Sequence, residues 1–174
     1  FDPAADPAVA YDREASRKAF LAAGWTRKDD GWHLPKTAKP LALEVLSPDR
    51  KSNPQAWAAA QQVVSDWHRM GFEVTHVGLP VAKFVERLTK GDFQAAVADV
   101  TVGLDPDLYP LLASSQTVTG GSNVAGVQDP ALDTVLAAAR APGTHETRLA
   151  ACSKLQAQLA KGRYLLPLAF PDEV

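Results

Sequence analysis

The sequence predicts an α/β fold in which a mixed, largely parallel sheet is flanked by helices. Between residues 41 and 100, short strand-like runs alternate with helix-like segments, and the connections between them are brief. Strands that alternate with helices form βαβ units, whose crossover helices cover a parallel sheet. The chain has 174 residues, of which 46% are hydrophobic and 22% are charged. This length and composition suit one globular domain with a core of its own.

A helix and a hairpin are expected before the first parallel strand. Asp12 is a suitable N-cap for the helix, and Gly24 is a suitable residue to end it. The segment "WTRKDDGWHL" follows, with Asp30-Gly31 near its centre and a tryptophan towards either end. An Asp-Gly pair between strand-like residues is typical of a tight hairpin turn, so we expect the turn at this pair.

The first βαβ unit is predicted from a strand at 41–47, "LALEVLS", and a strand at 72–77, "FEVTHV". The segment between them carries the signals of a helix. Asn53 can cap its first turn, Pro54 needs no hydrogen-bond donor at the first helical position, and Gly71 can end it.

A second crossover helix is expected at 80–91, followed by a strand at 93–100, "FQAAVADV". The helix is predicted to face the core through four apolar residues at helical spacing: Val81, Phe84, Val85 and Leu88.

The rest of the chain is predicted to be mainly helical, with a helix at about 106–113 and a long polar loop at 114–128. A loop of that length suggests a functional surface. Further helices are expected to open at Asp129-Pro130 and Thr144, and a last strand is expected at 163–170. The residues predicted to face inward are Leu132, Val135, Leu136 and Ala139 in the first of these helices, and Leu149, Cys152, Leu155 and Leu159 in the second.

Charge and composition exclude several classes of protein. The formal net charge is −2 and no basic block stands out, so we expect no nucleic-acid partner and no binding to an anionic membrane surface. The sequence has no run of eighteen apolar residues. Its single cysteine excludes an internal disulfide.

No catalytic, metal-binding or cofactor-binding motif is evident. The four histidines are far apart and lack metal-ligand spacing, and "TGGSN" lacks the lysine of a phosphate-binding loop. We therefore expect no metal, no cofactor and no enzymatic activity.

Three carboxylates in "ADVTVGLDPDLYP" remain to be explained: Asp99, Asp105 and Asp107. They could serve a carboxylate-dependent enzyme, but a general acid or base needs a positioned partner, and the sequence offers none for Asp99. Capping accounts better for the other two. Asp105 would cap a helix that has Pro106 at its first position, and Asp107 would face the positive end of the helix dipole.

The order of segments resembles a known family. "YDREASRKAFLAAGW", "DGW", "LALEVLS", "QAWAAAQQVVSDWHRMGFEVTHV", "FVERLTKGDFQAAVADV", "GLDPDLYPLL", "SNVAGVQDPALDTVL" and "ETRLAACSKLQAQLAKGRYLLPLAF" follow its plan. Together they resemble the second large, C-terminal lobe of the bacterial extracellular solute-binding proteins of oligopeptide, dipeptide and nickel ABC importers. The resemblance implies a lobe like those of type II periplasmic binding proteins. We expect residues 1–174 to form a single α/β lobe excised from a two-lobed protein.

The carboxyl ends of the strands are where ligands collect in an open α/β sheet, so the segment after the third strand lies at the predicted rim. The candidate ligand-binding residues are Asp99, Thr101, Val102, Gly103, Asp105 and Asn123. Peptide-binding relatives commonly carry a Gly-Trp-x-x-Asp pattern here. The resemblance aligns Asp99 with the Trp and Val102 with the carboxylate that pairs with a peptide's ammonium, and a valine cannot form that pair.

The resemblance implies a binding lobe without catalysis that acts for an ABC importer and takes a peptide or another small solute. The implied partners are that solute, the missing N-terminal lobe and the ABC permease. The implied location is extracytoplasmic, either the periplasm or a lipid anchor at the outer face of the cytoplasmic membrane. The substituted "DVTVG" segment motivates an alternative, a diverged lobe that acts in protein–protein regulation at the cell envelope.

Overall fold

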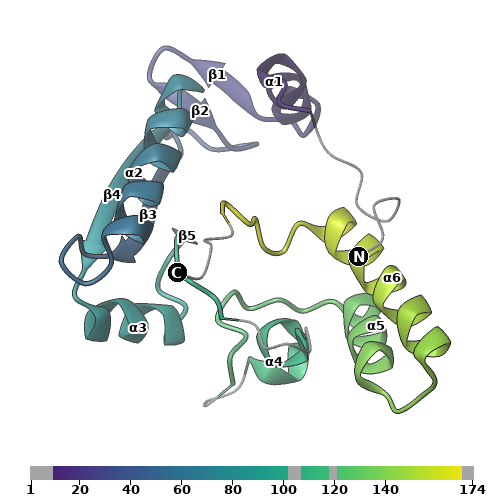
Figure 1. Cartoon of the computed structure of the whole chain (residues 1–174). Helices are drawn as coiled ribbons and strands as arrows, with labels where there is room; N and C mark the ends of the chain where they lie inside the picture. The colour runs from purple at the N-terminus through teal and green to yellow at the C-terminus, as the bar shows by residue number, and fades with distance from the viewer. Residues whose placement is uncertain (1–9, 102–106, 118–120, 170–174) are drawn as a thin grey trace. The chain divides into compact units, whose positions relative to one another are not determined.

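The computed structural model describes residues 10–101, 107–117 and 121–169 (Figure 1). These residues fall into two structural units. The sheet unit comprises residues 10–88 and 92–99, and the helical unit comprises residues 89–91 together with the described residues from 100 onward. Each unit is described by itself.

The sheet unit begins with helix α1 (Arg13–Ala22) and a hairpin of strands β1 (Thr26–Lys28) and β2 (Gly31–His33). The side chain of Asp12 accepts a hydrogen bond from the Ala15 amide at 2.9 Å, which confirms the predicted cap. The predicted position of the turn was wrong by one residue. Lys28 pairs with Gly31, so the turn residues are Asp29 and Asp30.

An aromatic cluster packs the hairpin onto the rest of the sheet unit. The rings of Trp32 and Phe72 are stacked with their centroids 5.9 Å apart, and Phe20 lies 5.4 Å from each of them. Trp32 is 2% exposed, and its indole nitrogen donates to the Met70 carbonyl at 2.9 Å. A buried indole needs such an acceptor, so this bond fixes the orientation of the ring.

Three parallel strands form the main sheet: β3 (Ala42–Pro48), β4 (Glu73–Leu79) and β5 (Ala95–Ala96), in the order β4-β3-β5. This topology confirms the predicted α/β class with a largely parallel sheet. Strand β5 is shorter than the predicted 93–100. Its ladder is confined to Val45 and Leu46, and the last bond runs from the Val97 amide to the Leu46 carbonyl at 2.8 Å.

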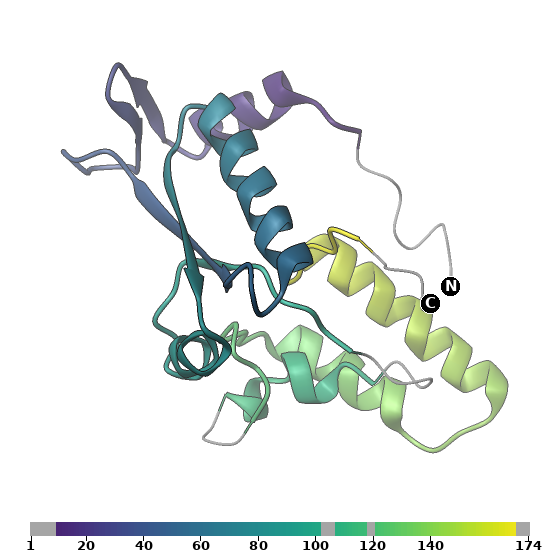
Figure 2. The same cartoon turned by 60° about the vertical axis from the view of Figure 1, so that its left-hand side comes forward.

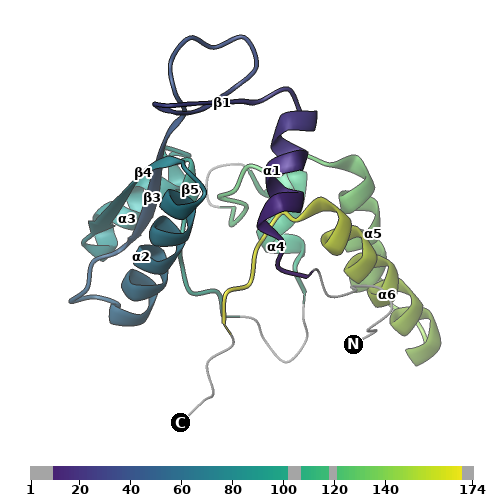
Figure 3. The ribbon, with the colours of Figure 1, turned by 90° about the horizontal axis from the view of Figure 1, so that it is seen from above.

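Helices α2 (Pro54–Arg69) and α3 (Val81–Thr89) make the two crossovers. Right-handed crossovers to opposite sides of β3 place these helices on opposite faces of the sheet, as Figure 3 shows from above. The predicted cap of α2 is confirmed by a 2.9 Å hydrogen bond from the Ala56 amide to the Asn53 side chain. Figure 2 shows α2 lying along the strands.

Helix α3 contacts the core through a narrower face than predicted. Phe84 is 5% exposed and Leu88 is half-buried, but Val81 and Val85 are 52% and 48% exposed. The prediction that these two valines face the core was therefore wrong. Phe84 is the one buried residue of this nine-residue helix.

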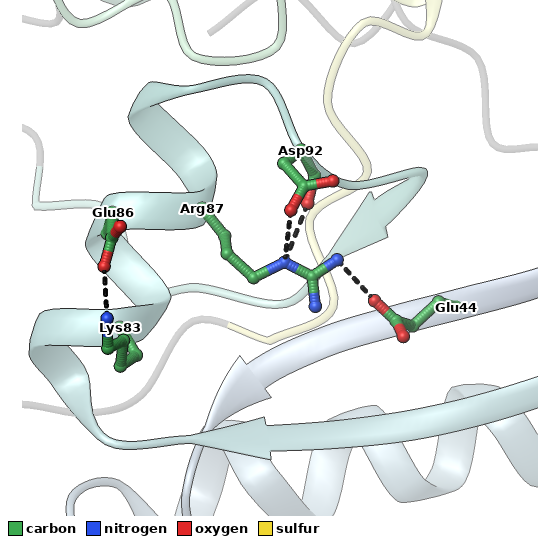
Figure 4. Close-up of polar contacts among 5 residues, drawn as sticks. All are labelled: Glu44, Lys83, Glu86, Arg87 and Asp92. Atoms are coloured by element: carbon green, nitrogen blue, oxygen red, sulfur yellow. Dashed lines mark hydrogen bonds and ion pairs between the residues drawn. The ribbon is translucent and has the colours of Figure 1, made fainter.

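Arg87 connects α3 to two other parts of the sheet unit (Figure 4). Its guanidinium lies 2.6 Å from a Glu44 carboxylate oxygen on β3 and 3.1 Å from Asp92, which precedes β5. The hydrogen bond to Glu44 holds the pKa of the Arg87 guanidinium above its usual value, so the group stays charged. These contacts fix the end of the crossover beside the central strand.

The helical unit contains α4 (Tyr109–Leu112), a 3₁₀ turn η1 (Ser114–Gln116), α5 (Pro130–Arg140) and α6 (His145–Gly162). Helices α5 and α6 pack side by side (Figures 1 and 3). The buried core of this unit consists of Leu112, Ala113, Leu132, Leu136 and Leu155. The inward face predicted for α5 is confirmed, whereas Leu149 of α6 is 56% exposed, contrary to prediction.

Residues 163–169 do not form the strand predicted for 163–170, of which residue 170 lies outside the described part. A strand requires a partner, and the helical unit has no sheet among its described residues. Arg163 takes a left-handed conformation at φ 50°, which ends α6. Leu165, Leu166 and Leu168 are left exposed.

Candidate functional site

The carboxyl ends of β3, β4 and β5 meet at one edge of the sheet unit. We call residues 47–53, 78–79 and 97–99 the carboxyl edge. The Asp49 amide donates to the Leu79 carbonyl at 2.7 Å, so β3 and β4 end together. In open α/β sheets ligands bind outside this edge, which makes it the candidate site.

Asn53 and Asp99 are joined across the carboxyl edge. The Asn53 side-chain amide donates to an Asp99 carboxylate oxygen at 2.5 Å, although the residues are 46 positions apart. The carbonyl oxygen of the same Asn53 side chain caps α2. One half-buried side chain therefore fixes a helix start and an exposed carboxylate together. The sequence analysis identified Asn53 only as a cap.

Asp49 shapes the loop between β3 and α2. Its carboxylate accepts a hydrogen bond from the Ser52 amide at 2.7 Å. Hydrogen bonds from Ser52, side chain first, lower the pKa of Asp49 below the usual carboxyl value, so it is ionised at neutral pH. The turn places Asn53 at the start of α2, in position to reach Asp99.

Behind the loop, the buried Ser47 and the half-buried His76 form a polar pair. Ser47 is fully buried, its hydroxyl donates to the Pro48 carbonyl at 2.7 Å, and its oxygen lies 2.8 Å from His76 Nε2. Because Ser47 is fully buried, its hydroxyl is not placed to attack a substrate. Burial lowers the pKa of His76, which keeps the ring neutral at pH 7.

Trp57 covers this pair from α2 and carries Arg50 on its face. The Arg50 guanidinium lies 5.5 Å from the Trp57 ring centroid, and the Trp57 ring lies 5.6 Å from that of His76. A Cβ added at Gly78 would lie 3.1 Å from Trp57, so a glycine at the end of β4 allows the indole to sit this close. The stack holds a cation beside the loop at the carboxyl edge.

The sequence-predicted site residues are distributed over both units. Asp99 belongs to the sheet unit and is exposed, and Thr101 is exposed and belongs to the helical unit. Val102, Gly103 and Asp105 lie outside the described residues. The structure thus supplies a partner for Asp99, and the role in ligand binding stays a prediction for all of them.

Asn123 organises the polar loop of the helical unit. It is 4% exposed, and its side-chain amide donates to the carbonyls of Ala113 at 3.0 Å and Val127 at 2.9 Å. Its side-chain oxygen accepts from the Val127 amide at 3.0 Å. All these bonds are to backbone, so the side chain holds the loop closed, and its predicted contact with a ligand stays a prediction.

The helix predicted for 106–113 begins later, at Tyr109, with Leu108 at the cap position. Asp107 accepts from the Tyr109 amide at 3.0 Å and pairs with Arg140 at 3.2 Å. Arg140 also lies over the Tyr109 ring, 4.4 Å from its centroid. Asp107 therefore anchors α4 to α5 through Arg140, and the predicted cap, Asp105, lies outside the described residues.

The described part of the chain brings together no group of three histidine, cysteine or acidic side chains that could hold a metal ion. Among the same residues, every helix is too short or too polar to cross a membrane.

Comparison with known proteins gives a family match over most of the chain. The family model described as bacterial extracellular solute-binding proteins, family 5 Middle, matches residues 1–123. Proteins of Brucella melitensis and Brucella abortus, named only as candidate binding proteins, are each 28% identical over 163 residues. The alignments cover 91% of this chain and 26% of each relative, so the chain spans about a quarter of the length of the relatives.

Solved structures share the fold at low sequence identity. The oligopeptide-binding protein AppA of Bacillus subtilis, in complex with a nonapeptide, matches with a TM-score of 0.81 and 18% identity, over 91% of this chain and 31% of AppA. NikZ of Campylobacter jejuni, in complex with Ni(L-His), gives 0.77 and 18%, over 88% and 31%. The periplasmic binding protein MelB of Agrobacterium fabrum, in complex with stachyose, gives 0.77 and 14%, over 94% and 26%. At these identities the likeness shows the fold alone, which is the type II periplasmic-binding-protein fold.

Proposed function

Because the chain belongs to the bacterial extracellular solute-binding proteins of family 5, we propose that it is the second lobe of a receptor that delivers a small solute to an ABC importer. The observation that carries this proposal is the carboxyl edge. There the exposed carboxylate of Asp99 is fixed by Asn53, at the position where α/β sheets bind ligands.

The proposed role is binding without a chemical step. Ser47 lies 2.8 Å from His76 Nε2 but is fully buried, so its hydroxyl is not placed to attack a substrate. The carboxylate of Asp99 has a neutral amide as its described partner, not a base or an acid. These features favour hydrogen bonding to a solute over proton transfer.

We propose two further partners for this chain, a second lobe of the same receptor and a permease. The chain spans about a quarter of their length, so the proposed receptor has a further lobe that contributes the opposite wall of the binding site. A receptor of this kind closes on its solute and presents it to a permease at the outer face of the cytoplasmic membrane. Residues 1–174 would form one α/β lobe of that receptor.

The chemical class of the solute can be considered from the residue at position 102 and from the ligands of the fold neighbours. The resemblance aligns Val102 with the carboxylate that pairs with a peptide's ammonium, which favours solutes that do not depend on that ion pair unless Asp99 supplies the charge. The fold neighbours bind a nonapeptide, Ni(L-His) and stachyose, three chemically different ligands. We propose that Asp99, Thr101, Val102, Gly103, Asp105 and Asn123 contribute to the solute site from this lobe.

Isothermal titration calorimetry on the complete receptor tests this function. The probes are trialanine, stachyose and Ni(L-His), and saturable binding of one of them with a stoichiometry near one is the expected result. The 174-residue chain alone should bind the same probe far more weakly, because it lacks the opposing wall and the closure that excludes water. Failure of the complete receptor to bind any of the three would contradict the proposal, and so would equally tight binding by the isolated chain.

A further inference from the structure

The contact between Asn53 and Asp99 has a consequence for how a solute is recognised. Each oxygen of a carboxylate can accept hydrogen bonds, and the Asn53 amide occupies Oδ2 of Asp99 at 2.5 Å. The other oxygen, Oδ1, has no hydrogen bond among the contacts of the described residues. Asp99 is exposed, so Oδ1 can receive a donor from outside the protein.

Hydrogen bonds restrict the side chain of Asn53, and this restriction orients the carboxylate of Asp99. Its own oxygen accepts from the Ala56 amide at 2.9 Å, and its backbone amide donates to the Asp49 carbonyl at 2.9 Å. A side chain bonded at both ends of its amide cannot rotate freely. The carboxylate that it holds is therefore oriented before a ligand arrives, which lowers the entropic cost of binding.

The position of Asp99 explains why it needs a positioning partner. The ladder of β5 ends at Ala96, and the last backbone bond of this strand to the sheet is made by Val97. Asp99 lies two residues beyond that bond, where the strand no longer constrains its direction. The side chain of Asn53 replaces the missing ladder contact.

We infer that Asn53 is a positioning residue of the solute site: it holds Asp99 so that Oδ1 accepts a hydrogen bond from a hydroxyl or amine donor of the solute. This inference rests on the proposed solute-binding function. Asn53 itself does not contact the solute. Its contribution to affinity passes through the carboxylate of Asp99.

The test is a double-mutant cycle on the complete receptor, with whichever of trialanine, stachyose and Ni(L-His) it binds. Asn53→Asp keeps the length and the capping oxygen of the side chain but removes the donor and adds a like charge, and Asn53→Ser keeps a cap but cannot reach both partners. Each should weaken binding by roughly tenfold or more in the wild-type background. Neither should weaken it further once Asp99 is replaced by Ala, because the two residues act as one unit.

Melting curves of every variant accompany the cycle, and Asp12→Asn at the cap of α1 is the matched control. This control changes a cap of the same kind at a site with no contact to Asp99, and it should leave the affinity unchanged. An equal loss of affinity with and without Asp99 would overturn the inference, because Asn53 would then act by another route. Unchanged binding in both Asn53 variants would overturn it as well. A wild-type receptor that binds none of the probes would instead refute the proposed function on which the inference rests.

Discussion

The hydroxyl of Tyr164 donates a hydrogen bond to the carboxylate of Asp129, which joins the segment after α6 to the first turn of α5. Asp129 is also the N-cap of α5, where its other oxygen accepts from the Ala131 amide at 2.8 Å and the Leu132 amide at 3.2 Å. The carboxylate of Asp129 thus caps α5 and also holds the segment that follows α6.

Replacing Tyr164 with Phe should lower the melting temperature by a few degrees at neutral pH, with a pH profile set by the lost bond. This bond lowers the pKa of Asp129 and raises that of Tyr164. The stabilisation by Asp129 is full above about pH 4 and is lost as the pH falls through its lower folded-state pKa. The stabilisation by Tyr164 is full below about pH 10 and is lost as the pH rises through its higher folded-state pKa. Melting curves of both proteins should therefore converge at both extremes. Tyr11→Phe, at an 87% exposed site, should match the wild type throughout.

The leucines of the helical unit should differ sharply in their tolerance of substitution. Leu132 is fully buried in the core, so Leu132→Ala should reduce the free energy of unfolding by about 2–5 kcal/mol. Leu149 is 56% exposed, so Leu149→Ala should change it by less than about 0.5 kcal/mol. Urea denaturation followed by circular dichroism gives both values. Equal losses at the two sites would contradict the packing of α5 and α6 described above.

Arg87→Met should destabilise the sheet unit, since it leaves Glu44 and Asp92 without their shared partner (Figure 4). Salt screens charge pairs of this kind, so the difference in melting temperature from wild type should shrink between low salt and about 1 M NaCl. Lys83→Met is the matched control, because Lys83 pairs with Glu86 at 2.8 Å within one exposed helical turn. That variant should melt close to the wild type at every salt concentration. A salt-independent loss for Arg87→Met would assign the effect to packing of its alkyl chain.

Asn123→Ala should cost about 1–3 kcal/mol, because it leaves buried backbone groups of the polar loop without partners. Amide hydrogen exchange should show faster exchange at Val127, whose amide donates to this side chain. Ser122→Ala alters an exposed neighbour and should leave both measurements unchanged. Wild-type exchange at Val127 in the Asn123 variant would exclude the role of Asn123 in closing the loop.

The sequence predicted best those features that depend on nearby residues. The caps at Asp12, Asn53, Asp129 and Thr144 are all confirmed, because a cap is decided within one helical turn. The parallel order of strands followed from their alternation with helices. The exposed valines of α3, the exposed Leu149 and the unpaired segment 163–169 were not predictable in this way, because apolar spacing does not reveal whether a partner element is present.

In the candidate site, too, the features that depend on nearby residues were predictable and those that depend on distant residues were not. Asp99 could be placed at the carboxyl edge from its position after a strand, but its partner lies 46 residues earlier. The available signal was topological: an N-cap that follows a parallel strand shares an edge with residues that follow the neighbouring strand. The pairing of Ser47 with His76 and the stacking of Arg50 on Trp57 depend on the register of β3 and β4, which single-sequence patterns do not fix.

The central place of β3 in the order β4-β3-β5 affects how the protein is made. This strand leaves the ribosome first of the three, and its buried residues Val45 and Leu46 have no lateral neighbours until residues 73–79 and then 95–96 have been synthesised. Since parallel pairing cannot begin before the crossover chain exists, the nascent chain leaves β3 without any partner for the time needed to translate roughly thirty residues. Chaperone binding during synthesis would be most useful in that interval.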